Sequence, residues 1–133
     1  MYKLFLDDVR SPLDCSKYMH TKLGPDNLIY LEEGWIIARN FEDFKKCLYT
    51  YGIPDIVSFD HDLGDDIADV RVEAGMSKRK ARSLKKEERD GNDCAKWLMD
   101  WCTAHNSFPD KIFIHSMNPV GAERIKNTIG GHV

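Results

Sequence analysis

Residues 2–10 read YKLFLDDVR, in which a short apolar run ends at two aspartates. This pattern is typical of a buried strand. Three later runs are similar in length and character: WIIAR at 35–39, DIVSF at 55–59 and KIFIH at 111–115. We therefore expect four short strands, and the first and third of them lead directly into carboxylates.

Helical patterns separate these strands. Residues 41–51 place apolar side chains on one helical face, and Gly52 ends that helix. Residues 119–129 form the last helix, which begins with a proline at the position where its missing N–H costs nothing. A further helix with apolar side chains at helical spacing ends before Pro109. We expect the N-caps of these helices at Asn40, at Asn92 or Asp93, and at Asn118.

Short strands that alternate with helices indicate βα units, and hence an α/β fold with a parallel sheet. Residues 11–34 are the weakest part of this pattern because they show little periodicity. A crossover helix belongs there if the first two strands are parallel. Alternatively, Leu28–Trp35 adds an antiparallel strand at an edge of the sheet.

The chain has 133 residues, so we expect a single domain over residues 1–133. With 42% hydrophobic and 31% charged residues, the composition is that of a folded globular protein. No apolar run approaches the ~20 residues that cross a bilayer, and the start has no signal-peptide pattern, so we expect a cytoplasmic protein. The four cysteines form no CxxC pair, which favours reduced thiols over a structural zinc site.

Residues 65–91 lack a clear apolar period, and we interpret them as an irregular or helical insertion. Within it, Ser77–Arg89 holds seven Lys and Arg against two Glu, a local charge of +5. Because the whole chain carries −3, the remainder carries −8. A basic run of this kind fits a solvated helix, a mobile loop or a patch that binds phosphate.

In an open parallel sheet, ligands bind at the carboxyl ends of the strands. Three strand ends deliver polar residues to that edge: Asp7, Asp8 and Arg10; Asp60, His61 and Asp62; and His115, Ser116 and Asn118. Crowded carboxylates repel one another unless a cation compensates them, and hard oxygen ligands suit Mg²⁺ or Mn²⁺. We therefore expect such an ion between Asp7, Asp8 and Asp60.

Each of these residues also has a plainer interpretation. A single aspartate at a strand end can cap a helix or turn, and Arg10 can simply pair with an aspartate instead of clamping phosphate. His61 can be an exposed loop histidine, and His115 a core histidine rather than a proton donor or acceptor. Ser116 and Asn118 can be turn and cap residues. The arrival of several acids on two strands favours the metal site over capping alone.

Four motifs in order, LFLDDVRSP, SFDHDLG, GNDCAKWL and HSMNPVGAERI, resemble the cyclic-phosphate processing receiver-like family of phages and bacteria. The likeness covers most of the chain apart from roughly 11–34 and 65–89. It implies a single-domain, flavodoxin-like three-layer fold with a mostly parallel sheet of about four strands. A signalling receiver has a fifth strand that ends in a lysine, so this sequence is truncated in comparison.

The resemblance also implies a metal-dependent phosphoesterase that acts on the cyclic phosphate of a nucleotide or an RNA end, in a bacterial or phage-infected cytoplasm. By position, Asp7 and Asp8 match metal ligands. Asp60 matches the phosphoacceptor of receivers, so it is either a ligand or a nucleophile. On this interpretation, catalysis falls to Asp60, His61 and His115, and phosphate or substrate binding to Arg10, Asp62, Ser116 and Asn118.

Two other functions stay open at this point. The Asp-x-Asp of IVSFDHDLG also resembles a haloacid-dehalogenase-like phosphatase, although that family places the motif near its start. A non-enzymatic module that binds phosphate or a nucleotide would use the same acidic site. In each case Ser77–Arg89 is a candidate for contacts with the phosphates of RNA.

Overall fold

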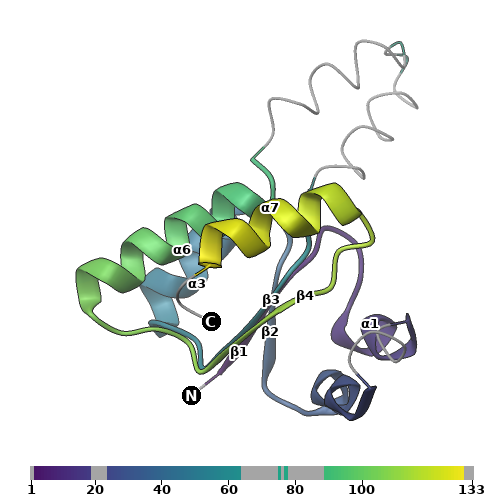
Figure 1. Ribbon diagram of the computed structural model, residues 1–133, viewed down its shortest axis with the longest axis horizontal. Helices are drawn as coiled ribbons and strands as arrows, with labels where there is room; N and C mark the ends of the chain where they lie inside the picture. The colour runs from purple at the N-terminus through teal and green to yellow at the C-terminus, as the bar shows by residue number, and fades with distance from the viewer. Residues whose placement is uncertain (1, 19–23, 64–74, 76, 78–88, 131–133) are drawn as a thin grey trace.

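The computed structural model describes residues 2–18, 24–63, 75, 77 and 89–130 (Figure 1). All four strands of its sheet run parallel, in the order β2-β1-β3-β4. The strands are β1 (Lys3–Leu6), β2 (Trp35–Ala38), β3 (Ile56–Phe59) and β4 (Lys111–Ile114). Each strand agrees with its predicted run to within one residue, because a strand buried on both faces is a continuous apolar run in the sequence.

Helices cover both faces of the sheet, as Figure 1 shows. The helix α1 (Pro12–Tyr18) and the 3-10 helix η1 (Gly24–Leu31) lie on one face. The other face carries α3 (Phe41–Tyr51), α6 (Gly91–His105) and α7 (Pro119–Ile129). This arrangement confirms the predicted α/β three-layer, receiver-like fold.

Two cores form because side chains alternate across the sheet. Leu4 and Leu6 are buried in the larger core, on the side of α3, α6 and α7. Phe5 stands between them in sequence and belongs to a smaller core with Cys15 and Tyr30. Residues from α1 and η1 thereby fill the second face of β1.

The segment between the first two strands differs from one of the two predictions. Residues 24–31 form η1, and Trp35 begins β2, which pairs in parallel with β1. An antiparallel edge strand over Leu28–Trp35 is therefore wrong, and α1 and η1 provide the crossover. The helical turn lets Tyr30 pack against Phe5 and lets the carbonyl of Ile29 accept a hydrogen bond from Trp35 Nε1 at 3.1 Å.

The N-caps at Asn40 and Asn118 are confirmed, but that of α6 lies at Asp90, earlier than predicted. The Asp90 carboxylate accepts the backbone N–H of Asp93 at 2.9 Å, and the Asp93 carboxylate accepts that of Asp90 at 2.9 Å. Asp93 is thus the third residue of a reciprocal capping box rather than the cap. Asn92 lies within the helix and accepts a hydrogen bond from Thr128 of α7.

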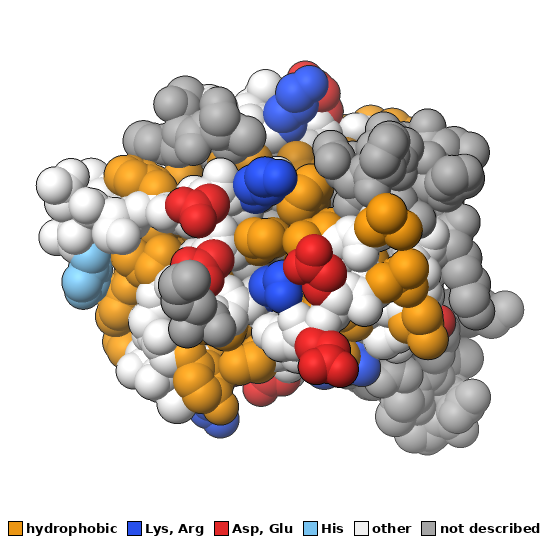
Figure 2. Space-filling model, turned by 90° about the horizontal axis from the view of Figure 1, so that it is seen from below, with side chains coloured by type: hydrophobic (Ala, Val, Ile, Leu, Met, Phe, Trp, Pro, Cys, Tyr) orange, Lys and Arg blue, Asp and Glu red, His pale blue; other side chains and the backbone are white. Residues whose placement is uncertain are grey.

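Several further predictions meet the structure only in part. The four cysteines are free and buried. None of the helices in the described part of the chain has the length and apolar character needed to cross a membrane. Of the predicted insertion, nearly all, including Ser77–Arg89 apart from its two ends, lies outside the described residues. Figure 2, seen from below, shows acidic, basic and apolar side chains interspersed on that face, with no large patch of one charge among the described residues.

Candidate active site

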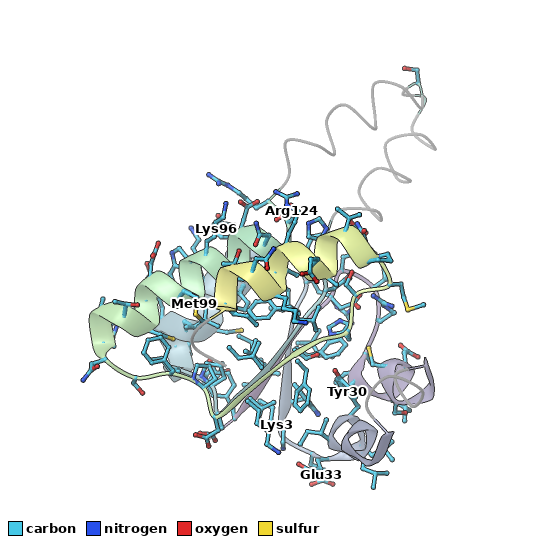
Figure 3. All side chains as sticks on the ribbon, in the orientation of Figure 1. Lys3, Tyr30, Glu33, Lys96, Met99 and Arg124 are labelled. Atoms are coloured by element: carbon cyan, nitrogen blue, oxygen red, sulfur yellow. The ribbon has the colours of Figure 1, made fainter. Side chains whose placement is uncertain are left out.

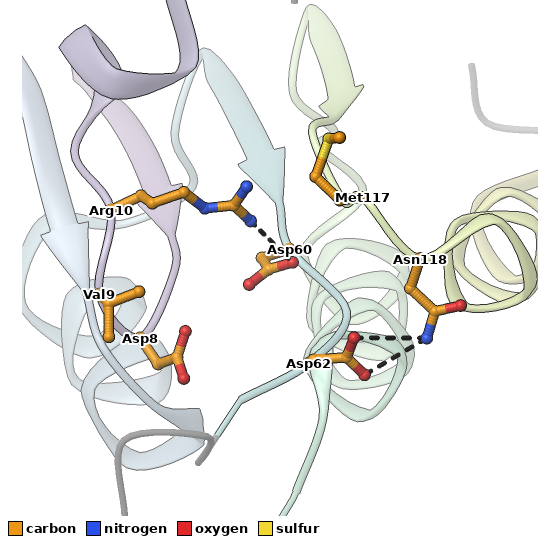
Figure 4. A pocket seen from close by; sticks show the side chains of 7 residues that line it. All are labelled: Asp8, Val9, Arg10, Asp60, Asp62, Met117 and Asn118. Atoms are coloured by element: carbon orange, nitrogen blue, oxygen red, sulfur yellow. Dashed lines mark hydrogen bonds and ion pairs between the residues drawn. The ribbon is translucent and has the colours of Figure 1, made fainter. Parts of the chain in front are cut away.

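A cavity of about 260 Å³ opens at the carboxyl edge of the sheet, beside β1 and β3 (Figure 4). The chain leaves these neighbouring strands toward opposite edges of the sheet, to β2 and to β4. Open α/β sheets bind ligands at such a switch point. The cavity is lined from three loops, by Asp8, Val9, Arg10, Asp60, Asp62, Met117 and Asn118.

Three carboxylates lie close together at this edge of the sheet, and two of them line the cavity. Asp7, Asp8 and Asp60 each offer an oxygen atom, and these atoms lie within 4.8 Å of one another. They meet because Leu6 and Phe59 are direct neighbours in the sheet, so the chain leaves both strands at the same level. The structure thus brings together the three residues that the sequence predicted as metal ligands.

Asp7 differs from the other two because it is fully buried and does not line the cavity. Its Oδ1 accepts the backbone N–H groups of Val9 at 3.0 Å and Arg10 at 2.8 Å. Its Oδ2 accepts Nε of Arg10 at 2.7 Å and Nε2 of His115 at 3.1 Å. Burial opposes ionisation, but these hydrogen bonds outweigh it and hold the pKa of Asp7 well below its usual value. Asp7 is therefore a buried anion, and its hydrogen bonds hold Arg10 and His115 in place next to the cavity.

Arg10 is the cation inside the acidic cluster. Its Nε bonds Asp7, and its Nη2 lies 3.3 Å from Oδ1 of Asp60, as the dashed line in Figure 4 shows. The loop that carries it is fixed in turn by Arg39, whose Nη1 donates to the backbone carbonyl of Arg10 at 2.7 Å. The guanidinium lines the cavity, so a bound anion would meet a positive group there.

The ionised form of the Asp60 carboxyl group is disfavoured in the folded protein. Burial raises the pKa of its carboxyl group to about 7, and the negative charges of Asp7 and Asp8 act in the same direction. Arg10 and the backbone N–H of His61 offset only part of this effect. A divalent cation beside Asp8 and Asp60 would relieve the repulsion, and carboxylate oxygens are the donors that Mg²⁺ and Mn²⁺ prefer. The residues present therefore fit such an ion.

A second polar group borders the cavity on the other side. Nδ1 of His61 donates to Oδ1 of Asp62 at 3.0 Å. Nδ2 of Asn118 donates to the two oxygens of Asp62 at 3.3 and 3.4 Å (Figure 4). Asp62 and Asn118 line the cavity, whereas His61 does not and is 8% exposed. His61 thus reaches the cavity through Asp62, and it is not the exposed loop histidine of the plainer interpretation.

His61 is wedged between the first turns of α6 and α7. The backbone N–H of Gly91 donates to its carbonyl at 2.7 Å. A Cβ atom at Gly121 would overlap the His61 ring, and one at Gly91 would overlap the carbonyl of Asp60. Nε2 of His61 makes no hydrogen bond among the described residues and lies 3.4 Å from the carboxylate of Asp90. Two glycines therefore allow the helices to hold this loop closely.

His115 and Ser116 lie away from the cavity. His115 is fully buried and joins the site through its hydrogen bond to Asp7, while burial lowers the pKa of its ring. Ser116 is 1% exposed, and its Oγ accepts the backbone N–H of Asn118 at 3.1 Å. These positions agree with the core and turn interpretations of the two residues, and neither of them lines the cavity.

A family model for the cyclic-phosphate processing receiver domain matches residues 2–131. The chain belongs to this family. Its name connects the family with the processing of cyclic phosphates and with the receiver fold, so the resemblance of the four motifs is confirmed. Comparisons with curated proteins and with solved structures found no match.

Membership of the receiver family also bears on the alternatives. It argues against the haloacid-dehalogenase-like phosphatase, because the Asp-x-Asp after β3 belongs to a receiver sheet. The described part of this receiver domain has four strands, and the lysine-bearing fifth strand of signalling receivers has no counterpart within it.

Sequence reasoning missed two kinds of residue at this receiver site. Val9 and Met117 line the cavity with largely exposed apolar side chains, 58% and 60% respectively, and nothing in their local sequence marks them. Tyr30 and Ser58 lie behind the site and join it through His115. Ser58 carries a detectable signal, because it is a polar residue in the middle of an apolar strand.

Proposed function

We propose that this receiver domain is a metal-dependent phosphoesterase that opens the cyclic phosphate of a nucleotide or of an RNA end. One observation carries the proposal: the carboxylates of Asp8 and Asp60 and the guanidinium of Arg10 line the same cavity. A site of this kind offers hard oxygen ligands for a cation beside a positive group for an anion. The family's connection with cyclic phosphates supports the choice of anion.

The proposed cofactor is Mg²⁺ or Mn²⁺. Asp8 and Asp60, which line the cavity, would bind the ion directly. Asp7 does not line the cavity, but its carboxylate lies close to theirs and would add negative charge near the ion. When bound, such an ion neutralises phosphate oxygens and activates water. Burial, together with the negative charges of Asp7 and Asp8, raises the pKa of Asp60 to about 7, and a cation would relieve the part that these charges cause.

Arg10 and Asp62 are the cavity residues with the clearest chemical parts. The guanidinium of Arg10 would pair with the non-bridging phosphate oxygens, whose charge grows as the ring opens. The carboxylate of Asp62 would accept the proton of the attacking water, while the hydrogen bonds from His61 and Asn118 keep its oxygens in place. Water adds to phosphorus, one ester P–O bond breaks, and the released oxygen takes up a proton to give a phosphomonoester.

The test is direct turnover of defined substrates. The protein is incubated with Mg²⁺ or Mn²⁺ and with a 2′,3′-cyclic nucleotide, a 3′,5′-cyclic nucleotide or an RNA oligomer ending in a 2′,3′-cyclic phosphate, and phosphomonoester is followed by ³¹P NMR. We expect Asp8→Asn and Asp60→Asn to lower kcat/KM by about 100-fold or more, the minimum worth of a metal ion. The matched control is Asp100→Asn, because Asp100 is exposed on α6 and far along that helix from the cavity.

Two outcomes would redirect the proposal. Tight binding of all three substrates without any phosphomonoester would identify a binding module instead. Chemical trapping during turnover distinguishes the two parts open to Asp60. Borohydride reduction of the side chain of Asp60 to an alcohol means that it forms an acyl phosphate and is the nucleophile, whereas an unchanged Asp60 means direct attack by water.

A further inference from the structure

A line of four buried polar side chains runs from η1 through the sheet to the candidate site. Tyr30, Ser58, His115 and Asp7 are each at most 2% exposed, and they come from η1, β3, the end of β4 and the end of β1. Tyr30 OH lies 2.8 Å from Ser58 Oγ, and Ser58 Oγ lies 2.6 Å from Nδ1 of His115. Nε2 of His115 completes the line at 3.1 Å from Asp7 Oδ2.

The alternation of the sheet explains how these residues meet. On β3, Val57 and Phe59 belong to the larger core, so Ser58 between them faces the side of α1 and η1. Figure 3 shows Tyr30 on that side of the sheet, opposite Met99 of α6. A hydroxyl group at this strand position would be costly to bury alone. Tyr30 and His115 supply its partners.

The directions of the hydrogen bonds follow from the last acceptor. The Asp7 carboxylate also accepts Nε of Arg10 and two backbone N–H groups, so it has no proton to offer. Nε2 of His115 is therefore the donor to Asp7. In the neutral ring Nδ1 then has no proton, so it accepts a hydrogen bond from the hydroxyl group of Ser58. Ser58 Oγ can in turn accept a hydrogen bond from the hydroxyl group of Tyr30. Every donor in the line has an acceptor.

Aromatic contacts fix the plane of the His115 ring. Phe5 stacks on it with ring centroids 4.4 Å apart and planes 5° apart. Tyr30 meets it edge-on, with centroids 6.4 Å apart at 82°. The ring therefore has little freedom to rotate, and its two nitrogens stay aimed at Ser58 and at Asp7.

We propose that Tyr30 and Ser58 are positioning residues that fix the His115 tautomer and thereby the orientation in which Asp7 holds Arg10 at the cavity. This inference rests on the proposed metal and phosphate site. In this inference His115 is not a general acid or base. Its ring is fully buried and does not line the cavity, so it is not in a position to contact a substrate there.

The experiment combines a direct reading of the ring with a measurement of metal binding. Long-range ¹H–¹⁵N NMR of protein with ¹⁵N-labelled histidine reports which nitrogen of His115 carries the proton. Mn²⁺ titration followed by EPR then compares the wild type with Ser58→Ala and Tyr30→Phe. The matched controls are Ser107→Ala and Tyr49→Phe, which remove hydroxyl groups from exposed residues.

We expect a neutral His115 ring with its proton on Nε2. We expect Ser58→Ala to weaken Mn²⁺ binding by about 3- to 10-fold, as the net free energy of one hydrogen bond implies, and Tyr30→Phe to weaken it by a smaller factor. The control variants should bind Mn²⁺ as the wild type does. If Ser58→Ala does not fold, Tyr30→Phe, which keeps the buried ring, decides alone.

A proton on Nδ1 of His115, or Mn²⁺ binding equal to the wild type in the folded variants, would overturn the inference. Absence of Mn²⁺ binding to the wild type would overturn it as well, because the site it serves would not exist. Failure of the proposed function is recognised separately. If the wild type opens no cyclic phosphate but Ser58→Ala still weakens Mn²⁺ binding, the activity is wrong and the positioning line stands.

Discussion

Replacing Asp60 by Asn should stabilise the metal-free protein at pH 8 and leave its stability nearly unchanged at pH 4. The reason is the negative charge of the Asp60 carboxylate, which is buried in the lining of the cavity. The pKa of Asp60 is about 7 in the folded protein against an ordinary 3.8, so the folded state holds a proton there that the unfolded state has already lost. The wild type therefore loses stability as the pH rises from about 4 to about 7.

The magnitude follows from the same shift. The difference between 3.8 and about 7, at about 1.4 kcal/mol per pH unit, corresponds to about 4 kcal/mol at pH 8. Asn also loses the ion pair with Arg10, which lies 3.3 Å away, so we expect a net gain of about 1–3 kcal/mol in the free energy of unfolding.

The assay is urea unfolding with EDTA at several pH values between 4 and 8, for the wild type, Asp60→Asn and the exposed control Asp100→Asn. His115 titrates in the opposite sense, since its lowered pKa makes the folded state less stable as the pH falls below about 6.5. For that reason the relevant quantity is the difference between the two proteins at each pH. An Asp60→Asn protein that is less stable than the wild type at pH 8, or a difference that does not change with pH, would refute the reasoning.

Three other perturbations test further parts of the structure. Millimolar Mg²⁺ or Mn²⁺ should raise the Tm of the wild type but not that of Asp8→Ala, by mass action; a wild-type melting curve that either metal leaves unchanged contradicts the site. Gly121→Ala should lower the free energy of unfolding by about 1–3 kcal/mol, because the new methyl group overlaps His61, whereas Gly130→Ala meets no atom within 4 Å and should cost less. In the insertion, Ser replaces four basic residues: Lys78, Arg79, Lys80 and Arg82. This change should weaken binding of an RNA oligomer in a salt titration and flatten its salt dependence, yet leave binding of a mononucleotide unchanged. Equal effects on both ligands exclude the RNA contact.

The sheet and its acidic edge were predictable from the sequence for one physical reason. Buried parallel strands are continuous apolar runs, and whatever follows them meets at one edge. The runs that end before Asp7 and Asp60 therefore predicted both the strands and the approach of these carboxylates, which the sheet register confirms.

The parts that escaped prediction depend on contacts between distant residues. Asp90 and Asp93 both favour a helix start, and only their reciprocal hydrogen bonds show which of them is the cap. His115 follows an apolar strand in the same way whether its ring lines a cavity or a core. Its partner Ser58 is 57 residues away and was hidden within a run that predicts a strand correctly.

The hydrogen bond from Gly91 to the carbonyl of His61 has a consequence for how relatives of this domain can diverge. It joins the chain that leaves β3 to the start of α6, beside the backbone of Asp60 in the cavity lining. The free energy of closing a loop grows only slowly with its length, by about 0.6 kcal/mol for each doubling. We therefore expect that relatives can carry segments of different length and charge between these two residues while the sheet stays the same. The described residues that line the cavity follow β1, β3 and β4 directly and, apart from Asp62, lie outside that segment.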